Sequence, residues 1–176
     1  MDPSPLRGRN LTDCSLETEW RKDPTHQGGF LLDGGVHYMA GIRQLLAMQP
    51  GNNITRISAF TTQLQEHLPP VDTANVILKT TSSIIGSFQT SVGTTLREDE
   101  WTVACQNGWI KVGGSIITIS RDGKVTQKAI PNERTGVPTE VRAWGEALVG
   151  GAVKKELQPE AALADLELVS LRNILC

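Results

Sequence analysis

The sequence has few of the residues that mark specialised classes of protein. Aromatic residues make up only 5% of its 176 residues, and three cysteines are present. These cysteines, Cys14, Cys105 and Cys176, are far apart and odd in number, and they form no CxxC pair and no Cys/His quartet. That spacing argues against a disulfide framework and against a metal site, and it fits reduced thiols in a cytoplasmic protein.

Long runs of charge and of apolar residues are also lacking. Seventeen basic and nineteen acidic residues are scattered along the chain and give a net charge of -2. No basic stripe offers a surface for phosphates, so nucleic acid is not expected as a partner. No apolar run approaches the roughly 20 residues that cross a bilayer, and no secretory signal opens the sequence. A cytoplasmic protein without membrane contact is therefore expected.

The content of 39% hydrophobic and 20% charged residues is typical of a globular chain. Residues 1–19 are polar and irregular and predict a lead-in, followed by a single domain over 20–176. Apolar spacing predicts a helix from Asp33 to about Gln49 and two closing helices over 139–148 and 159–169. Alternating and β-branched segments predict strands at 54–62, 76–80, 84–92, 101–105, 109–112, 115–120 and 124–129. This order indicates an α+β fold with a largely antiparallel sheet.

The most distinctive stretch runs from Trp20 to Leu46. Asp33 and His37 are four residues apart, which places them on one side of a helix and one turn apart. With the helix beginning at Asp33, His37 would lie in the first turn, where the helix dipole disfavours an imidazolium. A neutral imidazole is a workable general base at neutral pH, and Asp33 could orient it or hold a substrate hydroxyl.

Structural interpretations of the same residues stay open. Asp33 is a strong candidate for the N-cap of the helix, and His37 could be an interior histidine. Trp20 could anchor the core, and Arg21 could be a surface charge. Arg43, Asp72, Arg97 and Trp101 are further positions that could line a pocket on the sheet face.

Four elements of this stretch occur in a set order: Trp20-Arg21, Asp23-Pro24, Gly28-Gly29, and Asp33-Gly34-Gly35-Val36-His37. The set resembles the signature of the second domain of the Gfo/Idh/MocA oxidoreductase family, and the resemblance covers roughly residues 19–176. It implies an open, largely antiparallel sheet with helices packed on one face.

The resemblance also implies roles for residues and a partner. His37 corresponds to the catalytic acid or base of the family, and Asp33 to the residue that holds the substrate. Trp20, Arg21, Gly34 and Tyr38 are the substrate-binding candidates around this pair. The sheet face implies a homodimer, because the family often forms its subunit interface there.

The sequence also departs from the family. No G-x-G-x-x-G follows a strand, as a dinucleotide-binding turn requires, and no Glu-Lys-Pro motif is present. We therefore expect no cofactor, and we predict a cofactor-independent enzyme of isomerase, dehydratase or cyclase type. It would act on a small molecule, for example in a specialised-metabolite pathway, with His37 as acid or base. The alternatives are the truncated substrate domain of an NAD(P)-dependent oxidoreductase and a non-catalytic binding or dimerisation module.

Overall fold

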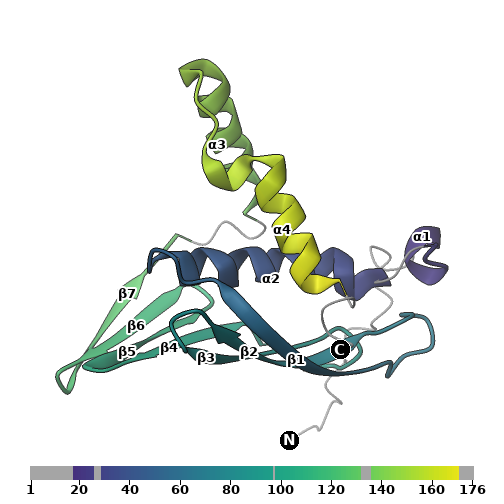
Figure 1. The fold of residues 1–176 in the computed structure, drawn as a ribbon, viewed down its shortest axis with the longest axis horizontal. Coiled ribbons are helices and arrows are strands. Elements are labelled where there is room, and N and C mark those ends of the chain that lie inside the picture. Colours follow the sequence, from purple (N-terminus) through teal and green to yellow (C-terminus); the bar gives the residue numbers. More distant parts are fainter. Residues whose placement is uncertain (1–17, 26–28, 97, 132–135, 171–176) are drawn as a thin grey trace, which may run out of the picture. The chain divides into compact units, whose positions relative to one another are not determined.

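The computed structural model describes residues 18–25, 29–96, 98–131 and 136–170 (Figure 1). The chain divides into two compact units, the first formed by Met1–Thr95 with Lys155–Cys176 and the second by Leu96–Lys154. All but two residues of the predicted lead-in lie outside the described residues. That residues 20–176 fold as a single domain stays a prediction.

The first unit contains a three-stranded antiparallel sheet in the order β1-β2-β3. Its strands are β1 (Ile54–Thr62), β2 (Thr73–Thr80) and β3 (Ile85–Ser91). Along β2, residues 74, 76, 78 and 80 are buried, whereas residues 75, 77 and 79 are exposed. Successive side chains of a strand point to opposite faces, so one face of this sheet is covered and the other is open.

Helix α2 (Gly29–Ala47) and the end of α4 (Pro159–Val169) lie over the buried face of this sheet, since residues of both line one cavity with it. α1 (Glu19–Lys22) contacts α2, and the short 3-10 helix η2 (Lys155–Leu157) contacts α4. α2 runs along the sheet, and α4 packs on α2 (Figure 1). At the contact, Val169 Cγ1 lies 3.6 Å from where a Cβ on Gly35 would be, which is ordinary van der Waals contact. Arg43 of α2 bonds the Asp165 carboxylate and donates to the Ala161 carbonyl at 2.9 Å, which ties the two helices together.

Asp72, one of the positions suggested for a pocket on the sheet face, instead holds the loop between β1 and β2. Its carboxylate is fully buried and accepts hydrogen bonds from the backbone N–H groups of Leu64 and Gln65 at 2.8 to 3.0 Å. The Thr73 hydroxyl donates a further bond to it at 2.8 Å. A buried carboxylate with this many donors is a structural group, so we withdraw it as a pocket residue.

The second unit contains a four-stranded antiparallel meander in the order β4-β5-β6-β7. Its elements are β4 (Glu100–Cys105), β5 (Gly108–Gly113), β6 (Ile116–Arg121), β7 (Lys124–Ala129) and α3 (Val137–Gly150). The β6–β7 turn has positive φ at both Asp122 and Gly123, the hairpin geometry that Asp-Gly predicts. Across β4 and β5, the Lys111 ammonium hydrogen-bonds the Glu100 carboxyl and lowers its pKa below the ordinary value.

The predicted α+β class with antiparallel strands is confirmed. The strands divide between two sheets, three in one unit and four in the other. The predicted hairpin at Gln106-Asn107-Gly108 joins β4 to β5, and the closing helix over 159–169 is present as α4. Among the described residues, no helix combines the length and the apolar character needed to span a membrane.

Candidate functional site

α2 begins four residues before Asp33, which corrects two expectations. The helix starts at Gly29, so Asp33 is not its N-cap and His37 lies more than two turns from its start. The cause is a close backbone approach. Gly29 has a φ of +47°, and a Cβ there would lie 2.0 Å from the Pro69 carbonyl oxygen. The helix dipole therefore does not reach His37, because its effect fades within the first turn.

The side chain of Arg21 links α1 to α2. Its Nε and Nη2 atoms donate to Asp33 Oδ2 at 3.2 and 2.6 Å, and Nη1 donates to Thr18 Oγ1 at 3.3 Å. The guanidinium carbon lies 4.4 Å from the centroid of the Trp20 ring and 5.4 Å from that of Phe30. Two rings and a carboxylate thus fix the guanidinium, an arrangement of cation–π contacts and a charge-assisted hydrogen bond.

Asp33 and His37 lie on the side of α2 that faces away from the sheet. His37 is two residues from both Gly35 and Met39, which are the buried residues of this segment. Two residues correspond to a rotation of about 200° around the helix axis, so His37 points away from the core. His37 is exposed, and it has no hydrogen-bond partner among the described residues. An imidazole in this state is accessible to a ligand.

The remaining candidates lie around this pair in different ways. Trp20 is 53% exposed and stacks on Arg21, and Gly34 follows Asp33, where an added Cβ would lie 3.8 Å from the Phe30 ring. Tyr38 points toward β3, where its ring lies 6.1 Å from that of Phe88. Trp20, Arg21 and Asp33 therefore form one contiguous cluster, with His37 one turn further along and Tyr38 on another side of the helix.

Two partners in this cluster, Thr18 and Phe30, were missed in the sequence. Phe30 directly follows Gly29, and its place one turn before Asp33 and Gly34 could have suggested contact with Arg21. Of the other positions suggested for a pocket, Arg43 is paired with Asp165 of α4, and Trp101 belongs to the second unit. Arg97 lies outside the described residues.

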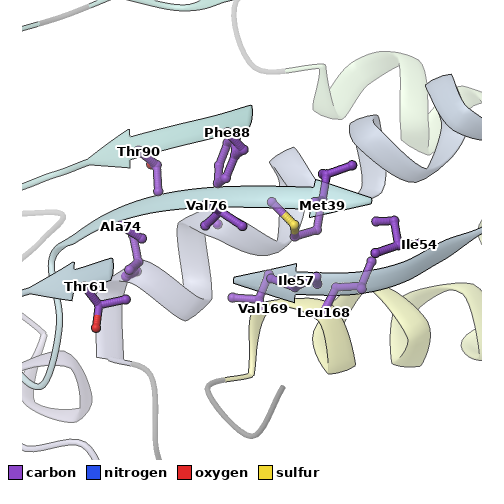
Figure 2. Close-up of a pocket in the computed structure, with 13 residues that line it drawn as sticks. Met39, Ile54, Ile57, Thr61, Ala74, Val76, Phe88, Thr90, Leu168 and Val169 are labelled. Carbon is purple, nitrogen blue, oxygen red and sulfur yellow. The ribbon is translucent and has the colours of Figure 1, made fainter. Parts of the chain in front are cut away.

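A cavity of about 50 Å³ lies inside the first unit, between α2, the sheet and α4 (Figure 2). Apart from the hydroxyls of Thr61 and Thr90, its lining is apolar. Figure 2 shows Met39, Ile57, Val76, Phe88 and Val169 converging on it. Asp33 and His37 do not line this cavity, nor the shallow hollow that Phe60 and Ile77 border on the open face of the sheet. Asp33 and His37 therefore lie outside both of these hollows.

The described residues do not fit a dinucleotide. A dinucleotide-binding turn joins a strand to a helix through glycines, and the pyrophosphate lies at the helix N-terminus. Among the described residues, no strand runs through such a turn into a helix. The N-terminus of α2 is instead packed on Pro69. The part of the chain described also contains no group of three His, Cys, Asp or Glu residues arranged to hold a metal ion.

Comparison with known proteins identifies the family of this chain. A family model described as the GFO/IDH/MocA C-terminal domain matches residues 6–111. Dehydrogenase FPY6 of Fusarium mangiferae is 34% identical over 159 residues, which are 88% of this chain and 45% of that protein.

Solved structures show the same fold. The structure of an oxidoreductase from Thermotoga maritima aligns with 96% of this chain and 46% of its own, with a TM-score of 0.74 and 25% identity. That of an aldose-aldose oxidoreductase from Caulobacter crescentus, complexed with glycerol, aligns with 88% of this chain and 47% of its own. Its TM-score is 0.70, and its identity of 16% supports the fold alone. The chain spans about half the length of these relatives.

Proposed function

The chain belongs to the GFO/IDH/MocA C-terminal domain family, and from that premise we propose that it is the substrate-binding part of a dehydrogenase-type oxidoreductase. Its substrate would be a small, neutral molecule with several hydroxyl groups. The similarity to a protein named as a dehydrogenase supports the reaction class. The observation that carries the proposal is the placement of Asp33 and His37 on one exposed side of α2, one turn apart.

In this proposal the two side chains have separate roles. The imidazole of His37 accepts the proton of the substrate hydroxyl whose carbon is oxidised, as a general base. The Asp33 carboxylate accepts a hydrogen bond from a neighbouring hydroxyl and so fixes the position of the substrate. Trp20 and Gly34 border this surface, and Tyr38 borders it from the side of the sheet.

The open position of the pair supports a site that a second surface completes. Asp33 and His37 line neither of the two hollows described above, and proton transfer benefits when water is excluded. Since the described residues do not fit a dinucleotide, the electron acceptor would be held by another part of the enzyme. The chemistry assigned to this chain is limited to binding, orientation and proton transfer.

Binding of myo-inositol and of glucose to the full chain tests the proposal by calorimetry or NMR titration. We expect Asp33→Asn and His37→Ala each to weaken binding about tenfold, since Asp33→Asn replaces a charged acceptor by a neutral amide and His37→Ala removes an acceptor. His67→Ala is the matched control, because His67 is another exposed histidine of the first unit. Affinities that do not change in the Asp33 and His37 variants would contradict the proposal.

Cofactor-independent acid–base catalysis, of isomerase, dehydratase or cyclase type, is the second candidate. The imidazole of His37 has no hydrogen-bond partner among the described residues, which favours this candidate, because a proton shuttle needs no further group. Incubating the chain with glucose in deuterated water, without nucleotide, separates this candidate from the first. Deuterium incorporation at carbon 2 that is lost in His37→Ala would support it, whereas absence of exchange would reject this aldose reaction.

A binding or dimerisation module is the third candidate, and the open face of the first sheet favours it. Phe60 is 85%, Ile77 60% and Ile85 72% exposed there. Apolar side chains gathered on one sheet face are typical of an interface, and a homodimer through this face would cover them. Phe60→Ser should then shift the sedimentation of the chain from dimer to monomer, whereas a monomeric wild-type chain would reject the homodimer.

A further inference from the structure

Arg21 uses two of its nitrogen atoms on one oxygen of Asp33. Nε and Nη2 both donate to Oδ2, at 3.2 and 2.6 Å. The other carboxylate oxygen, Oδ1, accepts no hydrogen bond from the described residues, and the side chain of Asp33 is 38% exposed. One oxygen of Asp33 is therefore fixed, and the other is presented to a ligand.

His37 would be expected to compete for the same carboxylate. Opposite charges four residues apart on a helix attract each other. Yet no hydrogen bond joins Asp33 to His37 in the structure. The guanidinium of Arg21 is the stronger partner, because its donors form a rigid fork and the rings of Trp20 and Phe30 confine it.

We propose that Arg21 is a positioning residue that withholds the Asp33 carboxylate from His37. As a result, Oδ1 of Asp33 and the imidazole of His37 stay available side by side, one turn of α2 apart. The substrate class that fits is a neutral vicinal diol: one hydroxyl donates to Asp33, and its neighbour gives its proton to His37. This inference rests on the proposed function for the role of the two groups, but the positioning is testable without a substrate.

Other charges on the elements around α2 also enter the titration of His37. Among the described side chains, those on α1 are Glu19 and Arg21, and those on α4 are Glu160, Asp165 and Glu167, of which Asp165 is paired with Arg43. On the sheet, Arg56 and Lys79 lie at exposed positions. Only Asp33 lies one turn before His37 on the same side of α2. Its contribution can be isolated with a double-mutant cycle.

The experiment is an NMR titration of the histidine rings in the full chain, which contains three histidines. His37→Ala assigns the resonance. In Arg21→Gln, Asp33 is free to turn toward His37, and its negative charge stabilises the imidazolium. We expect the titration midpoint of His37 to rise by about half a pH unit, as for opposite charges about 6 Å apart in water. In an Asp33→Asn background, the same Arg21→Gln substitution should cause a much smaller rise.

Two controls accompany the cycle. Arg43→Gln removes an arginine of α2 that, like Arg21 of α1, is paired with an aspartate, and it should leave the His37 midpoint unchanged. Arg21→Lys keeps the charge but lacks the planar fork, so the rise should be intermediate. The Arg21→Lys variant also keeps the test valid if Arg21→Gln detaches α1 from α2.

If Arg21→Gln raises the His37 midpoint equally with Asp33 present and with Asp33→Asn, Arg21 acts on His37 through its own charge. That result would overturn the proposal. No rise in the Asp33-containing chain would overturn it as well. Neither result depends on a substrate, so both leave the proposed function standing. Conversely, a titration as predicted together with a failure to bind myo-inositol and glucose would reject the proposed function alone.

Discussion

The two sides of α2 are built differently. On the side toward the sheet, Gly35 and Met39 are buried, and Arg43 ties the helix to Asp165 of α4. On the opposite side, Asp33 is held by Arg21, and His37 is exposed and has no hydrogen-bond partner in the part of the chain that the structure describes. One side therefore holds the fold together, while the other keeps reactive groups accessible. Substitutions on the two sides should separate loss of stability from loss of binding.

The largest loss of stability is expected at the start of α2. Gly29→Ala should lower the free energy of unfolding by about 3 kcal/mol, because Gly29 has positive φ and the Pro69 carbonyl fills the space of a Cβ. Chemical denaturation measures the change. Gly34→Ala is the matched control within the same helix, since its Cβ would meet only Phe30 at 3.8 Å. It should be neutral or stabilise by about 0.5 kcal/mol.

The next largest effect is expected on the buried side. Met39→Ala should cost about 2 to 3 kcal/mol, because it removes a buried side chain and enlarges the cavity that Met39 already lines. Met48→Ala, at a methionine that is 83% exposed just after α2, should be close to neutral in the same denaturation experiment. Equal losses in the two variants would show that the described core does not stabilise the protein.

The ion pair between α2 and α4 should contribute less. Arg43→Ala leaves the Asp165 carboxylate, with 12% of its side chain exposed, without its cation, and should cost about 1 to 2 kcal/mol. The ends of the pair are partly solvated, which keeps the effect moderate. Arg56→Ala, on the exposed side of β1, is the control and should leave the unfolding midpoint unchanged.

The smallest effect on stability is expected on the exposed side. His37→Ala should change the free energy of unfolding by less than about 0.5 kcal/mol, because the imidazole is exposed and makes no hydrogen bond among the described residues. Thermal unfolding followed by circular dichroism tests this expectation. A loss comparable to that of Met39→Ala would assign His37 to the structure and remove the basis for its proposed role.

Much of the fold could be predicted from local patterns. Two hairpin turns were predicted from the pairs Asn107-Gly108 and Asp122-Gly123, since such turns require positive φ or a missing Cβ. Proline at the first turn of α4 located its start. The predicted start of α2 lies four residues after the observed one, because the glycine pairs Gly28-Gly29 and Gly34-Gly35 fit turns and close backbone approach equally well. The structure uses Gly29 for contact with Pro69 and Gly35 for contact with Val169, and both contacts join residues far apart in the sequence.

The site could be predicted only in part for the same reason. The four-residue spacing of Asp33 and His37 placed them on one side of α2 whichever residue began the helix. That Arg21 binds Asp33 depends on how α1 folds back on α2, over a separation of twelve residues. Local spacing carries no information about that contact. The division of the strands into two sheets likewise follows from pairing between strands, which no single segment encodes.

The claim that the exposed side of α2 is the binding surface can be tested most directly by NMR, with myo-inositol titrated into the ¹⁵N-labelled full chain. We predict that the amide shifts change around Asp33 and His37 and remain constant on the open face of the sheet, around Phe60 and Ile77. Changes confined to that sheet face, or no changes at millimolar ligand, would contradict this assignment.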